Sequence, residues 1–121
     1  MFTPAQLHQI ARNERARRKA AWTAAGQDSS GRAREDDALW SNVEQITGLA
    51  AGDPLCQQRQ PQWWSEPQRI IMARSAWQTA CKADQRLDHA SAQDLATIRG
   101  LFHLYRWLRP ISWSPYAEKA T

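Results

Sequence analysis

Apolar side chains recur every three to four residues along most of the chain, which is the spacing of helices that bury one face. No segment alternates apolar and polar residues for long enough to suggest a β-strand. The helices expected from this pattern cover residues 4–25, 36–50, 66–87 and 92–109. The sequence therefore predicts an all-α fold, a small helical bundle of about four helices.

Three of these helices begin with a capping sequence, a hydroxyl followed three positions later by a side chain that can reach back to the cap. The predicted N-caps are Thr3, Ser65 and Ser91. For the remaining helix, Asp36 and Asp37 are expected at its start, where negative charge complements the helix dipole. Capping thus predicts where each of the four helices begins.

Each of the three later helices carries an apolar stripe when its residues are projected at about 100° per residue. The stripes comprise Leu39, Val43, Ile46, Leu49 and Ala50; Ile70, Ala73, Trp77, Ala80, Cys81 and Leu87; and Leu95, Ile98, Leu101, Phe102, Tyr105 and Leu108. They predict the core, with Cys81 as a small buried side chain. Pro110 prevents the last helix from continuing, but Trp113 and Tyr116 can fold back onto the bundle.

The first helix differs from the others because Glu14 and Arg17 interrupt its apolar stripe. We therefore expect three parts along the chain. Residues 1–26 form a basic amphipathic N-terminal helix, residues 27–35 a flexible polar linker, and residues 36–121 a helical core with a C-terminal tail. The N-terminal helix is either docked loosely on this core or extended from it.

Charge and composition favour a binding protein. The formal net charge is +4 and the isoelectric point is near 9.6, which suits acidic partners. Arg outnumbers Lys by 13 to 3 and the chain has seven Trp, and both Arg and Trp are enriched at binding hot spots. A GC-rich bacterial or phage genome would produce the same bias, so composition alone does not distinguish a binding function from a genomic bias.

A cationic stripe runs along the first helix and carries a tryptophan. It comprises His8, Arg12, Arg15, Arg18, Lys19 and Trp22. The stripe is a solvated face with Trp22 packed inward, a grip on nucleic-acid phosphates, or a contact with an acidic patch on a protein. No helix-turn-helix, zinc-finger spacing or heptad zipper accompanies it, which weakens the nucleic-acid interpretation.

A second candidate surface lies on the last helix, on the side opposite its apolar stripe. It comprises Ala96, Arg99, Gly100, His103, Arg106 and Trp107, of which Arg99, His103, Arg106 and Trp107 are the expected partner-binding residues. Gly100 makes a small-residue notch there, unless the first helix or the tail covers this side. Ile71 and Met72 also point away from their helix's stripe, which predicts a second apolar contact within the chain or a homodimer.

Catalytic and metal-binding patterns are missing from the sequence. Cys56 and Cys81 stand 25 positions apart without a C-x-x-C, so neither a zinc framework nor a disulfide scaffold is indicated. His8, His89 and His103 are not paired with other ligands at helical spacing, and no glycine-rich phosphate loop is present. We expect no enzyme activity, no catalytic residue, no metal and no cofactor.

The sequence also lacks an apolar run long enough to cross a membrane and an apolar signal-peptide core. We therefore expect a cytoplasmic protein without a membrane partner. The function expected first is that of a small regulatory or inhibitory protein that binds a larger protein, acting as a homodimer. The alternative is a nucleic-acid-binding accessory protein that uses the basic N-terminal helix.

Overall fold

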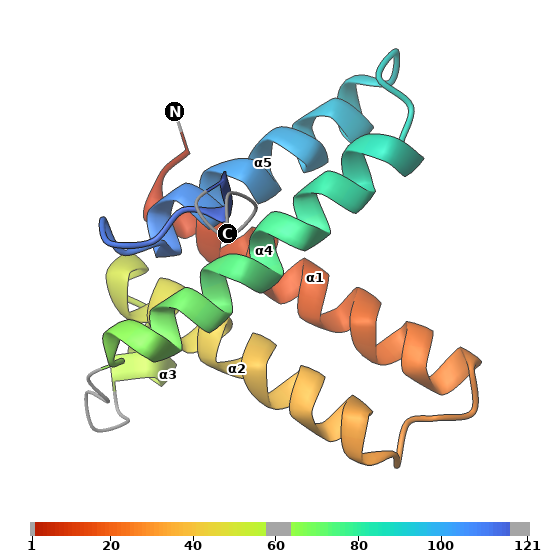
Figure 1. Ribbon diagram of the computed structural model, residues 1–121, viewed down its shortest axis with the longest axis horizontal. Coiled ribbons are helices and arrows are strands. Elements are labelled where there is room, and N and C mark those ends of the chain that lie inside the picture. Colours follow the sequence, from red (N-terminus) through yellow and green to blue (C-terminus); the bar gives the residue numbers. More distant parts are fainter. Residues whose placement is uncertain (1, 58–63, 117–121) are drawn as a thin grey trace. The chain divides into compact units, whose positions relative to one another are not determined.

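The protein is helical in a computed structural model that describes residues 2–57 and 64–116, and these two stretches contain no strand. Their five helices, in chain order, are α1 (Pro4–Ala24), α2 (Gly31–Ala51), α3 (Pro54–Gln57), α4 (Glu66–Arg86) and α5 (Ala92–Leu108) (Figure 1). The all-α prediction is confirmed. The short α3 is the helix that the sequence pattern did not reveal.

The chain divides into two compact units, Met1–Gln62 and Trp63–Thr121. In the first unit, α1 packs against α2, and α2 contacts α3. In the second unit, α4 packs against α5. Each unit is therefore built around a helical hairpin, and the basic N-terminal helix is one arm of the first hairpin.

The predicted caps are present at three helix starts. The Thr3 and Ser65 side chains each accept from the third backbone N–H of their helix, and a Gln side chain reaches back to complete the capping box. Ser91 caps α5 by accepting from the Asp94 N–H at 3.3 Å. Local hydrogen bonding therefore determines where α1, α4 and α5 begin.

The start of α2 differs from the prediction. Ser30 is the N-cap, and the helix runs from Gly31, so the second half of the linker expected at 27–35 is helical. Asp36 and Asp37 consequently lie in the second turn, and the first turn of α2 holds no acidic residue. The expectation that these two carboxylates complement the helix dipole was wrong, because a hydroxyl earlier in the chain caps the helix first.

The core of the first unit centres on Trp40, whose side chain is 0% exposed. Val43 is buried as predicted, but Leu39 is only half-buried and Ala50 is exposed. The buried face of α2 is thus rotated relative to the predicted stripe. The rotation follows from size, since burying an indole removes more apolar surface from water than burying any aliphatic side chain.

The core of the second unit follows the predicted stripes more closely. The predicted residues that are buried include Ala73, Ala80, Ile98, Leu101, Tyr105 and Leu108. Cys81 is half-buried. Met72, which lies off the predicted stripe, is 2% exposed and therefore has the second apolar contact expected within the chain, whereas its neighbour Ile71 is 49% exposed.

The tail after α5 folds back as predicted. Trp113 is buried with its ring centroid 6.3 Å from that of Tyr105, and the Tyr116 ring lies 5.5 Å from that of Trp77. Arg69 helps to fix the end of α5, because its guanidinium donates to the backbone carbonyls of the last two helical residues at 3.1 and 3.2 Å. These bonds satisfy carbonyls that the helix itself leaves without a donor.

Candidate functional site

The predicted cationic stripe of α1 meets a row of carboxylates on α2. Arg15 donates to both carboxylate oxygens of Asp37, at 2.9 and 3.1 Å, and to Glu44 at 2.7 Å. A two-bonded contact between a guanidinium and a carboxylate is among the stronger polar contacts in proteins. Arg15 therefore connects α1 to α2 through ion pairs.

Arg18 makes a similar connection one turn further along. It donates to Asp36 at 2.6 Å and to the buried Glu14 at 3.1 Å, and its guanidinium lies 4.8 Å from the ring centre of Trp40. The indole N–H of Trp22 donates to the other oxygen of Asp36 at 3.0 Å. Trp22, predicted as part of the binding stripe, is thus half-buried and hydrogen-bonded across the hairpin.

These ion pairs change the acidity of the groups that form them. The hydrogen bond from Arg15 lowers the pKa of Asp37 below its ordinary value of 3.8. In return, the bond to Asp37 raises the pKa of Arg15, and a bond to Glu14 raises that of Arg17. The carboxylate of Asp37 is therefore stabilised in its ionised form.

Arg12 and Lys19 are the more solvent-exposed basic residues of the stripe, whereas His8 is buried. The Arg12 side chain is 55% exposed, and its nearest carboxylate is Glu44, at 3.8 Å. Lys19 is exposed. Residues 2–57 contain seven Lys and Arg and seven Asp and Glu, so the charge of α1 is matched within its own unit.

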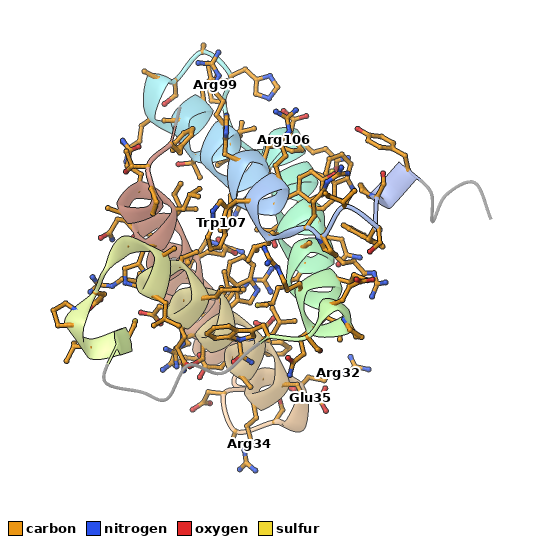
Figure 2. The ribbon with its side chains drawn as sticks, turned by 90° about the vertical axis from the view of Figure 1, so that its left-hand side faces the viewer. Arg32, Arg34, Glu35, Arg99, Arg106 and Trp107 are labelled. Carbon is orange, nitrogen blue, oxygen red and sulfur yellow. The ribbon has the colours of Figure 1, made fainter. Side chains whose placement is uncertain are left out.

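The second predicted surface lies along α5. Arg99 and Arg106 are exposed and project from the helix, with the half-buried His103 between them in the sequence (Figure 2). Trp107 is half-buried. Gly100 is buried, so the small-residue notch on this side is covered, which is the alternative to an open notch.

Next to Arg106 lies an aromatic cavity of about 600 Å³ that the sequence reading missed. It is lined by Trp77, Phe102, Tyr105, Arg106, Arg109 and Tyr116. Trp77 organises it, since its ring centroid lies 5.0 Å from that of Tyr105 and 5.5 Å from that of Phe102. The available signal was that Phe102 lies three positions before Tyr105 and four before Arg106, which places the three on one side of α5.

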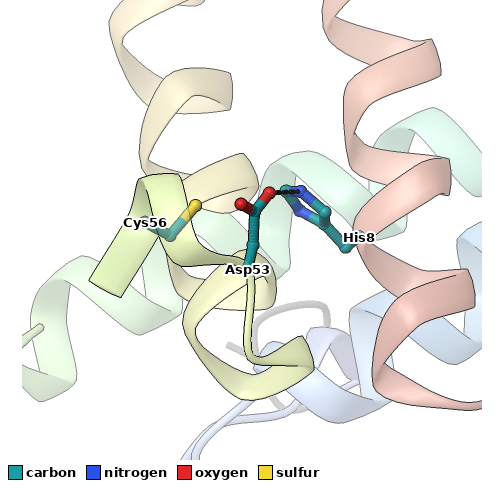
Figure 3. Close-up of side chains that lie close together, drawn as sticks. All are labelled: His8, Asp53 and Cys56. Atoms are coloured by element: carbon teal, nitrogen blue, oxygen red, sulfur yellow. Dashed lines mark hydrogen bonds and ion pairs between the residues drawn. The ribbon is translucent and has the colours of Figure 1, made fainter. Parts of the chain in front are cut away.

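A third cluster, in the first unit, brings together His8, Asp53 and Cys56 (Figure 3). Their potential ligand atoms all lie within 4.8 Å of one another, and His8 Nε2 is 3.2 Å from Asp53 Oδ2. The cluster lines a cavity of about 430 Å³ together with residues of α1 and α2. Sequence reasoning missed it, although Asp53 and Cys56 are three positions apart, because His8 joins them from a distant segment.

Comparisons with protein-family models, with curated proteins and with solved structures gave no match for this chain. In the stretches that the structure describes, no helix combines the length and apolarity that crossing a bilayer requires. The function is therefore inferred from the α5 surface, the paired stripe of α1 and the His8 cluster.

Proposed function

We propose that this protein is a non-enzymatic regulator or inhibitor that binds an acidic segment of a larger protein through the second unit. The observation that carries the proposal is the aromatic cavity between α4, α5 and the tail, which has Arg106 and Arg109 in its lining. Aromatic side chains and Arg together are the residue types that dominate binding hot spots.

The charge distribution supports an acidic partner for this unit. Residues 64–116 contain seven Lys and Arg but only four Asp and Glu, whereas residues 2–57 are balanced. The excess positive charge of the described chain thus belongs to the unit that carries the cavity. A partner segment with several carboxylates would complement it, because opposite charge steers association and fixes register.

The geometry of α5 suggests how such a segment is held. Arg99 and Arg106 are seven residues apart, which is about 10 Å along a helix. An aromatic or aliphatic side chain of the partner segment enters the cavity. Carboxylates of neighbouring residues in the same segment bind Arg106 and Arg109. Arg99 and His103 extend the contact along the helix, and the half-buried Trp107 contributes apolar surface beside it.

Exposed apolar residues also favour an interface on this unit. Four large apolar side chains are exposed among the described residues, and three of them, Ile71, Ile111 and Tyr116, belong to the second unit. The proposal includes a homodimer with Ile71 in the contact, and it places the protein in the cytoplasm. Sedimentation of wild type and I71E tests the dimer, which I71E should dissociate.

Binding is tested with labelled peptides that carry a single Trp among either Glu or Lys residues. We expect the Glu-rich peptide to bind and the Lys-rich peptide not to bind. The double variant R106Q/R109Q, which lacks both cavity arginines, should bind the Glu-rich peptide at least tenfold more weakly than wild type. The reason is that each lost charged contact is worth about 1.4 kcal/mol or more. The matched control is R86Q, which removes an exposed arginine of α4 outside the cavity.

Capture from a nuclease-treated bacterial lysate gives a second readout with the same variants. A protein retained by wild type and R86Q, but lost by the double variant, agrees with the proposal. Equal retention of this protein by wild type, R86Q and the double variant contradicts the proposal. Retention that disappears on nuclease treatment favours nucleic acid as the partner.

Nucleic-acid binding through α1 is the second candidate, because Arg12 and Lys19 are exposed on one stripe. Arg15 and Arg18 would first have to leave their carboxylates. Two phosphate contacts predict an affinity loss of about tenfold between 50 and 200 mM salt, while four predict about a hundredfold. The salt slope of binding to a DNA duplex therefore tells whether the paired arginines take part.

A further inference from the structure

We propose that His8, Asp53 and Cys56 form a binding site for a Zn²⁺ ion. These residues offer one nitrogen, one oxygen and one sulfur ligand, all within 4.8 Å of one another. They lie in the first unit, so the site is independent of the protein-binding surface proposed for the second unit. Three further observations support the assignment.

The first observation is the hydrogen-bond pattern around His8. The Thr47 hydroxyl donates to the Val43 carbonyl at 2.8 Å, so it accepts from His8 Nδ1 at 3.1 Å. With the proton on Nδ1, Nε2 of the neutral ring carries a lone pair, and it faces Asp53 Oδ2 at 3.2 Å. A Zn²⁺ ion placed between these two atoms would be held by both, with the ring oriented by Thr47.

The second observation is distance. Nitrogen and oxygen ligands at about 2.0–2.2 Å from a tetrahedral zinc are about 3.3 Å apart, close to the separation of Nε2 and Oδ2. Nitrogen and sulfur ligands of one zinc are about 3.6 Å apart. Cys56 Sγ is at most 4.8 Å from a ligand atom of each of the other two residues, so binding brings it closer to them.

The third observation is that the backbone holds the ligands in place. Gly52, with φ 77°, ends α2 in the left-handed conformation, and the following N–H of Asp53 donates to the Gly48 carbonyl at 2.9 Å. The N–H of Leu55 donates to Asp53 Oδ1 at 2.9 Å, which leaves Oδ2 directed at His8. The carboxylate is therefore oriented before any metal binds, as outer-shell partners orient ligands in metal sites.

Gly48 itself leaves the space that the cluster occupies. A Cβ at this position would overlap Sγ of Cys56 and lie 2.9 Å from Cε1 of His8. Glycine within a helix is less favourable than alanine. At Gly48, in the last turn of α2, it allows two potential ligands to approach the helix backbone closely.

The ligand types indicate zinc. Magnesium and calcium bind oxygen almost exclusively, whereas zinc accepts the combination of imidazole nitrogen, thiolate and carboxylate. A thiolate and a carboxylate together neutralise the charge of Zn²⁺. Three protein ligands leave the fourth position of the tetrahedron open to the cavity of about 430 Å³ that all three line.

The test is metal titration of the full chain after chelator treatment, kept reduced with a phosphine. Calorimetry should show one Zn²⁺ bound per chain, and Co²⁺ should give a thiolate-to-metal charge-transfer band. C56S should remove this band and weaken Zn²⁺ binding more than about a hundredfold, since losing a ligand costs at least as much as losing an outer partner. T47V, which removes the partner of Nδ1, should weaken binding about 10- to 100-fold.

The matched control is C81S, which replaces the chain's other cysteine outside the cluster and should bind both metals as wild type does. Circular dichroism of each variant establishes that it is folded. The proposal is overturned if the folded wild type takes up no stoichiometric Zn²⁺. It is equally overturned if C56S binds as tightly as wild type, or if C81S rather than C56S loses the Co²⁺ band.

Discussion

Arginines in the two units meet different surroundings. In the first unit, Arg15 and Arg18 donate to carboxylates on the facing helix, while in the second unit Arg106 is exposed beside a cavity of aromatic rings. All three arginines are in amphipathic helices. The sequence around Arg15 and Arg18 is more cationic than the sequence around Arg106. The facing helix, and not the arginine's own helix, therefore decides whether the charge of an arginine remains available for a ligand.

The two environments also differ in what they contribute to stability. The Arg18 guanidinium lies over the fully buried Trp40, and the ion pairs of Arg15 and Arg18 connect the two arms of the hairpin. The aromatic rings of the second unit surround an open cavity, with the exposed Tyr116 at its edge. The first arrangement favours a fixed hairpin and the second favours a surface that can receive another molecule.

The largest expected effect comes from removing the core beneath the ion pairs. W40A should lower the free energy of unfolding by about 3–5 kcal/mol, because it leaves a cavity and removes the ring on which Arg18 lies. Urea denaturation measures the change. W107A, which truncates the half-buried tryptophan of α5, is the control and should cost less than half as much. Equal losses would mean that the two units do not differ in this respect.

A smaller effect is expected from removing one arginine of each kind. R15Q removes the guanidinium that binds both Asp37 and Glu44, and it should cost about 1–2 kcal/mol. R106Q should change stability by less than about 0.5 kcal/mol, since the side chain is exposed. Thermal or urea unfolding of both variants measures the difference. If R106Q destabilises the protein as much as R15Q does, the two arginines do not differ in their contribution to stability.

The smallest effect is a dependence on acidity. Because the bond from Arg15 lowers the pKa of Asp37 from 3.8, ionised Asp37 stabilises the fold at higher pH, and this contribution is lost as the pH falls below 3.8 through the folded-state value. In D37N that loss is absent, so its melting temperature should fall less steeply than that of wild type between about pH 5 and 2. The contribution of ionised Asp37 to the free energy of unfolding should stay below about 1 kcal/mol, because its pair with Arg15 is partly exposed. Parallel curves would show that Asp37 and Arg15 are not coupled.

The sequence predicted the features that depend on neighbouring residues. The boxes at Thr3 and Ser65 are formed within one turn, and α1, α4 and α5 begin where they were expected. The buried face of α2 was not predicted, because Trp40 and not the aliphatic stripe determines which side packs inward. Local rules thus located the starts of three helices but not the buried face of α2.

The candidate sites depend on residues that are distant in the sequence. Asp36 and Asp37 were assigned to a helix dipole, and only the pairing of α1 with α2 shows them to be partners of Arg18 and Arg15. His8 is 45 positions from Asp53, and no spacing rule connects them. Arg106 was predicted as a binding residue, but the rings that surround it come from two helices and the tail.

The even charge balance of residues 2–57 bears on how the protein meets its partners in solution. At physiological ionic strength, fields from surface charges decay over about 8 Å, so cations and anions interleaved on one hairpin cancel within a short distance of its surface. The hairpin of α1 and α2 therefore draws an approaching polyanion only weakly. The net positive charge of the described chain is in residues 64–116, so an approaching anion is attracted more strongly by the unit with the aromatic cavity.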